Sequence, residues 1–311
     1  MELVRMGSRG SQLALWQAEH VAAALRSRGC AVSIEVITTT SDRLLEVSLS
    51  QVGTKGMFTK EIEEALAGGH IDLAVHSLKD VPTELQASFH LGAILRREEA
   101  RDAFVSRDFS GIADLPPAAR VGTSSLRRQA LLKAMRPDLQ IFPVRGNVDT
   151  RLKKLAGGEF AGMVLAAAGL GRLGRMEMVR EIISPEVMCP AAGQGALAIE
   201  IRSGDARTRE KISFLDDART RSEITCERSL LKGLGGGCQV PIGAWAETRN
   251  GELHLIAVVA HPDGTKVLRQ QGSGTDGELL GQEVAEGLWD QGAGLILKEV
   301  AASSASAPSQ P

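Results

Sequence analysis

Short strand-like runs that alternate with helical periodicity constrain the fold of this chain most. Residues 3–7 and 31–37 look like strands, the second through the alternation of Val32, Ile34 and Val36. Between these runs, one apolar face recurs at helical spacing through Leu13, Trp16, His20, Val21 and Ala24. A strand, a helix and a strand in this order predict a βαβ unit. The chain is therefore expected to open on a parallel sheet.

The same alternation continues through the first two-thirds of the chain. A helix near 59–67 precedes a strand at 71–75, and a second set of elements follows the two prolines at 116–117. This set is predicted as strand 120–122, helix 124–135, strand 139–144, helix 147–156 and strand 160–167. The strand-like run 196–202 comes next, and we expect it to return to the first sheet. Two α/β units are therefore predicted.

The last third of the chain changes character. A helix at 219–232 precedes three strand-like runs, which the hairpin dipeptides Asn250-Gly251 and Asp263-Gly264 join. The three runs are 239–247, 252–260 and 265–270. One long final helix is expected to cover this antiparallel sheet with Leu279, Leu280, Val284, Leu288 and Leu295. These patterns predict a small α+β domain.

A chain of 311 residues exceeds what one compact core usually organises, so we expect several domains. The patterns above divide the chain into residues 1–97 plus 196–216, residues 98–195, residues 217–300 and a flexible tail at 301–311. The fold class expected is α/β, with two α/β domains and a C-terminal α+β domain.

Cysteine spacing and the N-terminus indicate the compartment. The four cysteines are far apart and form no C-x-x-C pair, which argues against a zinc site and against a disulfide framework. The N-terminal residues enter a strand without a secretory signal, and no apolar run has the length of a membrane span. We expect a cytoplasmic protein without a metal, in which at least one thiol is free to react.

The middle of the chain is basic, although the whole chain carries a formal net charge of −2. Residues 121–180 hold 11 Lys or Arg against 4 Asp or Glu. A solvated charged face and an anion-binding surface are equally compatible with this composition. Nucleic acid is a weaker alternative, because single-strand binders interleave aromatic side chains and this segment contains only Phe142 and Phe160. A small polyanion fits better.

Polar clusters occur where predicted strands end and helices begin, which is the ligand-binding side of an open α/β sheet. One cluster follows the strand at 71–75 and contains Ser77, Lys79 and Asp80. A second cluster joins a strand to a helix N-terminus and contains Thr123, Ser124, Ser125, Arg127 and Arg128. A third contains Arg145, Gly146 and Arg151. As a set, these residues predict a site for carboxylates or phosphates.

Two further patterns are rejected as functional motifs. Residues 169–174 satisfy G-x-G-x-x-G, but they do not open a βαβ unit, and no acidic residue ends a strand about 20 residues later. Arg172, which lies within this motif, is kept as a further cation of the predicted anion site. His76 lies close to Asp80, but no Ser/His/Asp spacing supports a catalytic constellation, and we expect a packing histidine.

Cys238 follows three consecutive glycines and precedes a strand-like run. Glycine admits positive φ and has no side chain, so a bulky group can approach this sulfur closely. The glycines favour a tethering cysteine. A turn that happens to contain a buried cysteine is the alternative that spacing alone leaves open.

Three long motifs resemble those of the porphobilinogen deaminase family, also called hydroxymethylbilane synthases. They are Val-His-Ser-Leu-Lys-Asp-Val-Pro at 75–82, Gly-Thr-Ser-Ser-Leu-Arg-Arg at 122–128 and Gly-Gly-Cys-Gln-Val-Pro-Ile-Gly at 236–243. The resemblance runs from about residue 3 to 298 and includes Arg9, Ser11 and the Gly-Gln-Gly motif around Gln194. It implies two domains similar to periplasmic binding proteins around a cleft, and a small third domain with a three-stranded antiparallel sheet and the cofactor cysteine.

The resemblance implies a transferase of tetrapyrrole biosynthesis. Such an enzyme deaminates four porphobilinogen molecules, joins them head to tail on a dipyrromethane primer and releases linear hydroxymethylbilane by hydrolysis. Cys238 is implied to hold one dipyrromethane cofactor through a thioether, and Asp80 to act as acid and base. The implied partners are porphobilinogen and the growing polypyrrole chain, without nucleic acid or membrane, and a monomer is expected.

The implied binding residues neutralise or hydrogen-bond the acetate and propionate groups of the pyrroles. Cofactor binding is assigned to Ser77, Lys79, Thr123, Ser124, Ser125, Arg127, Arg128, Arg145 and Gly146. Substrate and chain binding is assigned to Arg9, Ser11, Lys55, Phe58, Arg151, Arg172 and Gln194. Phe58 matches the family residue on a mobile flap that packs against a pyrrole; a hydrophobic residue at a helix start is the alternative.

The chain departs from the family pattern at three positions outside the proposed chemical core. Gln51 stands where many relatives carry a second flap lysine, Ser41 replaces a frequent glycine, and Gly235 replaces a common acidic residue. The competing function is a two-lobed anion-binding protein without catalytic activity. That alternative does not explain Asp80 and Cys238.

Overall fold

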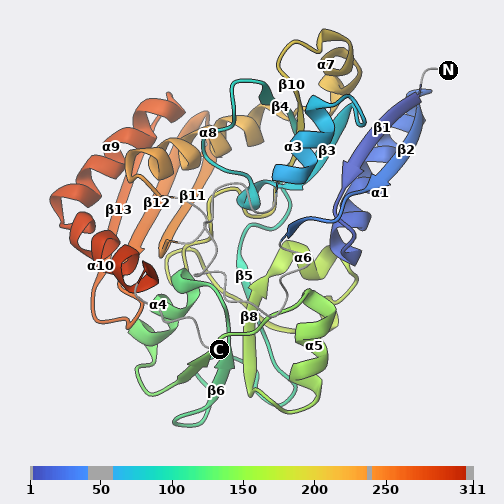
Figure 1. The fold of residues 1–311 in the computed structure, drawn as a ribbon. Helices are drawn as coiled ribbons and strands as arrows, with labels where there is room; N and C mark the ends of the chain where they lie inside the picture. The colour runs from blue at the N-terminus through green and yellow to red at the C-terminus, as the bar shows by residue number, and fades with distance from the viewer. Residues whose placement is uncertain (1–2, 41–58, 237–239, 306–311) are drawn as a thin grey trace.

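The computed structural model describes residues 3–40, 59–236 and 240–305. These residues contain three sheets, two of five strands and one of three strands. Figure 1 shows the three sheets in separate parts of the molecule, with the N-terminal sheet in blue and cyan, the middle sheet mainly in green and the C-terminal sheet in orange. The predicted fold class, two α/β units and an antiparallel three-stranded sheet, is confirmed.

The first sheet has the order β2 (Ala31–Val36), β1 (Leu3–Ser8), β3 (Leu73–Ser77), β10 (Leu197–Arg202) and β4 (Phe89–Ile94). Strand β1 pairs in parallel with β2 and β3, whereas β10 pairs antiparallel with β3 and β4. Helix α1 (Gln12–Ser27) buries Ala18, Val21 and Leu25 against this sheet, and α3 (Lys60–Ala67) buries Ile62 and Leu66. Both the parallel opening and the return of residues 196–202 to the first sheet are confirmed.

The second sheet repeats this arrangement with the order β7 (Gln140–Phe142), β6 (Arg120–Gly122), β8 (Gly162–Ala166), β5 (Asp102–Val105) and β9 (Val179–Ile182). Strand β6 is parallel to β7 and β8, and β5 is antiparallel to β8 and β9. Its helices are α4 (Leu126–Met135), α5 (Val148–Ala156) and α6 (Ala167–Arg172). The chain passes from the first sheet to the second at residues 95–101 and returns at 183–196, so two crossover segments join the sheets.

The third sheet is an antiparallel meander of β11 (Ile242–Arg249), β12 (Glu252–Ala260) and β13 (Val267–Gly274). Asn250 and Gly251 both have positive φ, as a two-residue hairpin requires. Helix α8 (Ala218–Gly233) packs on α9 (Gly277–Asp290), and α10 (Ala293–Ala305) follows. The expected single final helix is wrong, because Gly292 takes a φ of 94° and ends the α-helical path between α9 and α10.

Several elements differ from the expectations. The run 160–167 is a shorter strand that leads into α6, so the G-x-G-x-x-G residues lie in that helix and its end. Strands β4, β5 and β9 and helix α7 (Ala206–Ile212) had no counterpart in the sequence pattern. Three short 3₁₀ helices, η2 (Leu78–Asp80), η3 (Met176–Met178) and η4 (Ser213–Leu215), complete the described elements. Within the described ranges, no helix is both long and apolar enough to cross a membrane.

Candidate active site

The acidic candidate Asp80 ends the 3₁₀ turn that follows strand β3. The N–H of Val81 donates to the Leu78 carbonyl at 3.1 Å and closes this turn. Just before it, the Ser77 hydroxyl accepts a hydrogen bond of 2.8 Å from the Gln17 amide of α1. This local folding presents Asp80 half-buried at the carboxyl end of a buried parallel strand.

A pocket of about 100 Å³ gathers four of the predicted site residues. Arg9, Ser11, Ser77 and Asp80 all line it. Ser11 is also the N-cap of α1, because its hydroxyl oxygen accepts from the Ala14 N–H at 3.3 Å. The first sheet and α1 therefore bring a carboxylate, a guanidinium and two hydroxyls to one hollow.

The hydroxyls at the start of α4 shape their own loop. Ser124 Oγ donates to the Val144 carbonyl at 2.7 Å and accepts from the Val144 N–H at 2.9 Å. Ser125 caps α4 by accepting from the Arg128 N–H, and Thr123 Oγ1 accepts from the Ser125 N–H at 3.2 Å. These hydroxyls thus fix the loop at the start of α4 through hydrogen bonds to its own backbone.

Asp102, which the sequence reasoning missed, binds both arginines of this helix. Its carboxylate lies 2.8 Å from Arg127 Nη1 and 2.7 Å from Arg128 Nη2, and it is fully buried. Burial alone would raise the pKa of Asp102, but the two guanidinium charges outweigh it and hold that pKa well below its usual range. Arg127 also donates to the Cys189 carbonyl, and Arg128 to that of Val164.

Gln194 connects this arginine pair to the acidic loop of the first sheet. Its Nε2 donates to Asp102 at 2.8 Å and to the Ala100 carbonyl at 2.7 Å. Its Oε1 accepts from Lys79 Nζ and from Arg128 Nη2, both at 3.3 Å. The side chain predicted as a chain-binding group therefore joins cations from both sheets.

Lys79 is a weak base in this position. Burial lowers the pKa of Lys79 to about 8, the negative charge of Asp80 opposes that shift, and the positive charge of Arg128 adds to it. The Lys79 side chain therefore begins to lose its positive charge near physiological pH and is largely neutral about one pH unit above its pKa.

Three further arginines that were predicted as site residues differ in burial and in charge pairing. Arg151 Nε donates to the Gly146 carbonyl at 2.9 Å, and burial followed by the charge of Arg128 lowers the pKa of Arg151 to about 10. Arg145 is exposed beside Gly146, which has a φ of 100°. Arg172 is buried, and its charge already pairs with Glu98 at 3.0 Å.

Two ionic clusters contact the crossover segments, and the one around Glu227 is buried. From α6, Arg172 contacts Glu98 in the first crossover and donates to the Gly195 carbonyl in the second at 2.8 Å. From α8, Glu227 binds Arg97 in the first crossover at 2.6 Å and accepts from the Gly193 N–H in the second at 2.7 Å. Each cluster thus contacts both connections between the first two sheets.

His76 takes part in a buried pair with Glu200, at 2.9 Å from Nε2 to the carboxylate. Strands β3 and β10 make these two side chains diagonal neighbours, since His76 pairs with Ala198, two residues before Glu200. The expectation of a packing histidine agrees with this partner. The sequence reasoning missed Glu200 and Glu227, like Asp102, because only the fold reveals that these acidic side chains are buried beside polar partners. Glu200, an isolated acidic residue in an apolar strand, was the one available signal.

Three predicted site residues, Lys55, Phe58 and Cys238, lie outside the described residues, as do Gln51 and Ser41 among the departures. Gly235, the third departure, has a φ of 63° and lies in the turn that follows α8.

The described cysteines Cys30, Cys189 and Cys226 form no disulfide. Burial raises the pKa of the Cys189 and Cys226 thiols to about 12, which disfavours the reactive thiolate at both. In the same part of the chain, no group of three or more His, Cys, Asp or Glu residues has the arrangement of a metal site.

Comparison with known proteins matches nearly the whole chain to one family. A family model described as "Porphobilinogen deaminase, dipyromethane cofactor binding domain" matches residues 4–210, and one described as "Porphobilinogen deaminase, C-terminal domain" matches residues 222–290. Among solved structures, a putative methionine-binding lipoprotein of Bacillus subtilis is similar with a TM-score of 0.44 and 11% identity, over 72% of this chain and 93% of its own.

Curated relatives agree with the family models. The porphobilinogen deaminase of Bordetella parapertussis is 48% identical over 98% of both chains. That of Paraburkholderia phytofirmans is 50% identical over 96% of this chain and 90% of its own, and that of Thiobacillus denitrificans is 49% identical over 96% and 98%. With both family models and near full-length identity of about one half, this chain belongs to the porphobilinogen deaminase family.

Proposed function

We propose that this chain deaminates four porphobilinogen molecules, joins them head to tail on a dipyrromethane primer attached to Cys238, and releases linear hydroxymethylbilane in tetrapyrrole biosynthesis. One observation of the structure carries this proposal. The carboxylate of Asp80 shares a loop with Lys79, and Gln194 connects that loop to the arginine pair of α4. A single acid/base group beside several cations suits a reaction whose substrate is an amine with carboxylate side chains.

The described residues fit a group rich in carboxylates. Arg128 is buried, yet its Nε has no hydrogen-bond partner among the residues that the structure describes. Lys79 and Arg128 share one neutral acceptor, the Gln194 amide oxygen. A buried donor without a partner is costly, so an incoming carboxylate is favoured there. Together with Ser77, Thr123, Ser124, Ser125, Arg127, Arg145 and Gly146, these two cations form the proposed cofactor site.

When bound, the dipyrromethane supplies a pyrrole carbon as the nucleophile for chain growth. The protein's own groups handle protons and charge. The Asp80 carboxyl donates a proton to the side-chain amine nitrogen of porphobilinogen, so that ammonia leaves. As a carboxylate, Asp80 then stabilises the positive charge at the pyrrole nitrogen and accepts the proton from the substituted ring carbon. Arg9, Ser11, Lys55, Phe58, Arg151, Arg172 and Gln194 are proposed to bind substrate and chain.

Cys238 is the proposed anchor because it is the cysteine placed in a glycine-rich segment, whereas burial keeps Cys189 and Cys226 protonated. We further propose the domain division 1–97 plus 196–216, 98–195 and 217–300, which the three separate sheets support, with residues 301–311 as a tail whose first five residues continue α10. A monomeric state and a cytoplasmic location, without nucleic acid or membrane as partner, complete the proposal.

Intact mass and turnover test the two central assignments. Denatured wild-type protein is expected to exceed its sequence mass by two porphobilinogens less two ammonias, and Cys238→Ser to lose that excess. Cys30→Ser is the matched control and is expected to keep it. Asp80→Asn is expected to keep the excess while hydroxymethylbilane formation slows by about 10²-fold or more, as removal of a general acid and base predicts.

An unchanged mass excess in Cys238→Ser would refute the anchor. Near-normal turnover of Asp80→Asn would remove Asp80 from the mechanism.

A further inference from the structure

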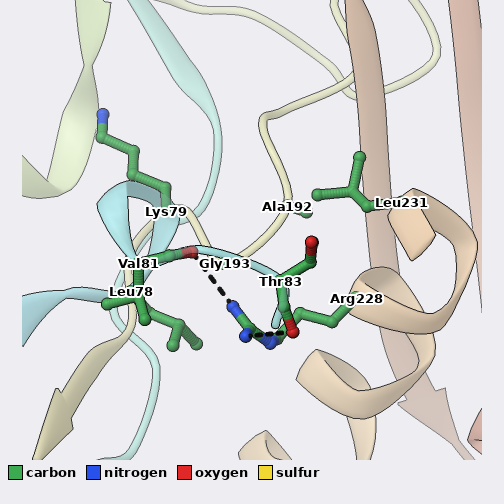
Figure 2. Close-up of a pocket in the computed structure, with 8 residues that line it drawn as sticks. All are labelled: Leu78, Lys79, Val81, Thr83, Ala192, Gly193, Arg228 and Leu231. Carbon is green, nitrogen blue, oxygen red and sulfur yellow. Dashed lines mark hydrogen bonds between the residues drawn. The ribbon is translucent and has the colours of Figure 1, made fainter. Parts of the chain in front are cut away.

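Arg228 of α8 contacts the backbone immediately after Asp80. Its guanidinium donates to three consecutive carbonyls, those of Val81 at 3.2 Å, Pro82 at 2.5 Å and Thr83 at 2.9 Å. Figure 2 shows the Arg228 side chain reaching from α8 to the backbone at Val81 and Thr83. Because a guanidinium presents donors in a rigid fork, three bonds to successive carbonyls restrict this loop strongly.

One face of α8 contacts the same loop over three successive turns. Ile224 belongs to a buried apolar cluster with Leu78 and Val81. Arg228 and Leu231 line a small pocket with residues of the loop, among them Leu78 and Val81. Positions 224, 228 and 231 follow the spacing of one helix face. The loop that carries Asp80 is therefore packed on α8 as well as hydrogen-bonded to it.

Lys79 has a different orientation from the clamped backbone. In Figure 2 its side chain extends away from Arg228, on the opposite side of the loop. Its Nζ reaches Gln194, which belongs to the second crossover. The loop is thus held by α8 on one side, and on another side its Lys79 reaches the second crossover. Asp80 lines the separate hollow with Arg9 and Ser11.

The far end of α8 leads into the segment that contains Cys238. The Gly236 N–H donates to the Leu231 carbonyl at 2.9 Å, and the Gly235 N–H to that of Lys232 at 3.0 Å. The first glycines of this segment therefore remain attached to the last turn of the helix. A single rigid helix contacts the Asp80 loop and begins the Cys238 segment.

We propose that Arg228 is a positioning residue that sets the location of the Asp80 carboxylate relative to α8. The inference rests on the proposed role of Asp80 as acid and base. Arg228 acts on the carbonyls of residues 81–83, so its effect on the reaction passes through the loop. Displacement of a catalytic group by about 1 Å costs up to about 10²-fold in rate, which makes such a contact measurable.

Arg228→Met tests the contact, because methionine keeps an extended apolar side chain and removes all the donors. We expect kcat to fall by about 10-fold to about 100-fold with a smaller change in KM, while the intact mass retains the cofactor excess. Arg228→Lys keeps a charged donor and is expected to recover part of the loss. Arg221→Met is the matched control, since Arg221 lies on the same helix and donates to the Leu91 carbonyl of the first sheet. Its kcat is expected to stay near that of the wild type.

A double variant separates positioning from a general loss of structure. If Arg228 acts through Asp80, then Asp80→Asn combined with Arg228→Met is expected to be no slower than Asp80→Asn alone. Losses that multiply in the double variant, or equal losses in Arg228→Met and Arg221→Met, would overturn the proposal. A slow Asp80→Asn beside a normal Arg228→Met refutes the positioning role alone, whereas a normal Asp80→Asn refutes the acid/base role on which it rests.

Discussion

At the scale of single residues, Asp102 is the carboxylate that pairs with both arginines of α4. The motif at 122–128 predicted two guanidiniums that bind ligand carboxylates or phosphates, and the structure gives both of them a shared, fully buried carboxylate of the protein. Sequence reasoning could not find this partner, because Asp102 and Arg127 are 25 residues apart and no local pattern reports such a contact. The cations were predictable from their position at a helix start; their counter-charge depended on the fold.

The titration of Lys79 gives a prediction at this scale. Its pKa of about 8 means that its positive charge is lost as pH rises through that value. Because a neutral amine attracts carboxylates less, the KM for porphobilinogen is expected to rise, by up to about tenfold, or about 1.4 kcal/mol. Lys79→Arg keeps its charge at these pH values and is expected to lack this rise. The test is the steady-state KM of the wild type and of Lys79→Arg, measured over about two pH units on either side of the Lys79 pKa.

If KM depends on pH in the same way in the wild type and in Lys79→Arg, then the charge of Lys79 does not affect substrate binding.

At the scale of elements, the starts of α1 and α4 show how two predicted site residues act in the fold. Ser11 and Ser125 were predicted as ligand-binding residues, and the structure shows both as helix N-caps. Short polar side chains at these positions satisfy backbone donors at the helix start. A sequence motif for anion binding and a motif for helix initiation are therefore the same residues here.

Two substitutions of Ser125 separate these roles. Ser125→Ala removes the cap and is expected to lower the free energy of unfolding by about 1 kcal/mol. Ser125→Asp keeps the cap but places a negative charge at the proposed carboxylate site, so it is expected to preserve stability and raise KM. Urea unfolding and steady-state kinetics of both variants provide the test. An unchanged KM in Ser125→Asp would show that this helix start does not bind substrate or chain carboxylates.

Elements joined as strand–helix–strand or by hairpin dipeptides were predictable, whereas several strands outside these patterns were not. Helix α1 was found near its true position because its apolar face repeats at helical spacing, and α4 and α8 also lie close to the predicted ranges. Strands β4, β5 and β9 were missed, since each pairs antiparallel with partners distant in sequence and no hairpin signal precedes it. One final helix was expected where two exist, because leucine spacing alone does not register the left-handed conformation of Gly292.

At the scale of the whole molecule, Glu227 connects the C-terminal unit to the two crossovers. It is fully buried and accepts from Arg97, Gly193 and Ala246. The two crossovers that join the first two sheets are therefore also held by the third unit. The order of sheets could be predicted from the chain, but this contact joins residues 130 apart and could not.

Glu227→Gln measures the strength of that connection. The substitution leaves the buried Arg97 without its counter-charge, which costs about 3–5 kcal/mol of unfolding free energy. Glu223→Gln is the control on the same helix, because the Arg219 partner of Glu223 is largely exposed and its loss is expected to matter less. Denaturant unfolding of both variants gives the comparison. Equal losses of unfolding free energy in the two variants would show that the Arg97–Glu227 pair stabilises the protein no more than the Arg219–Glu223 pair.

The crossovers also affect the order in which the polypeptide acquires its structure during synthesis. All five strands of the second sheet lie between residues 102 and 182, whereas the first sheet needs β10 at residues 197–202 between β3 and β4. On the ribosome, the middle unit therefore has its complete sheet before the N-terminal unit does, contrary to the usual order in which N-terminal domains fold first. Until β10 emerges, β3 and β4 have unpaired edges, and the nascent N-terminal unit is exposed to misassembly and to chaperone capture.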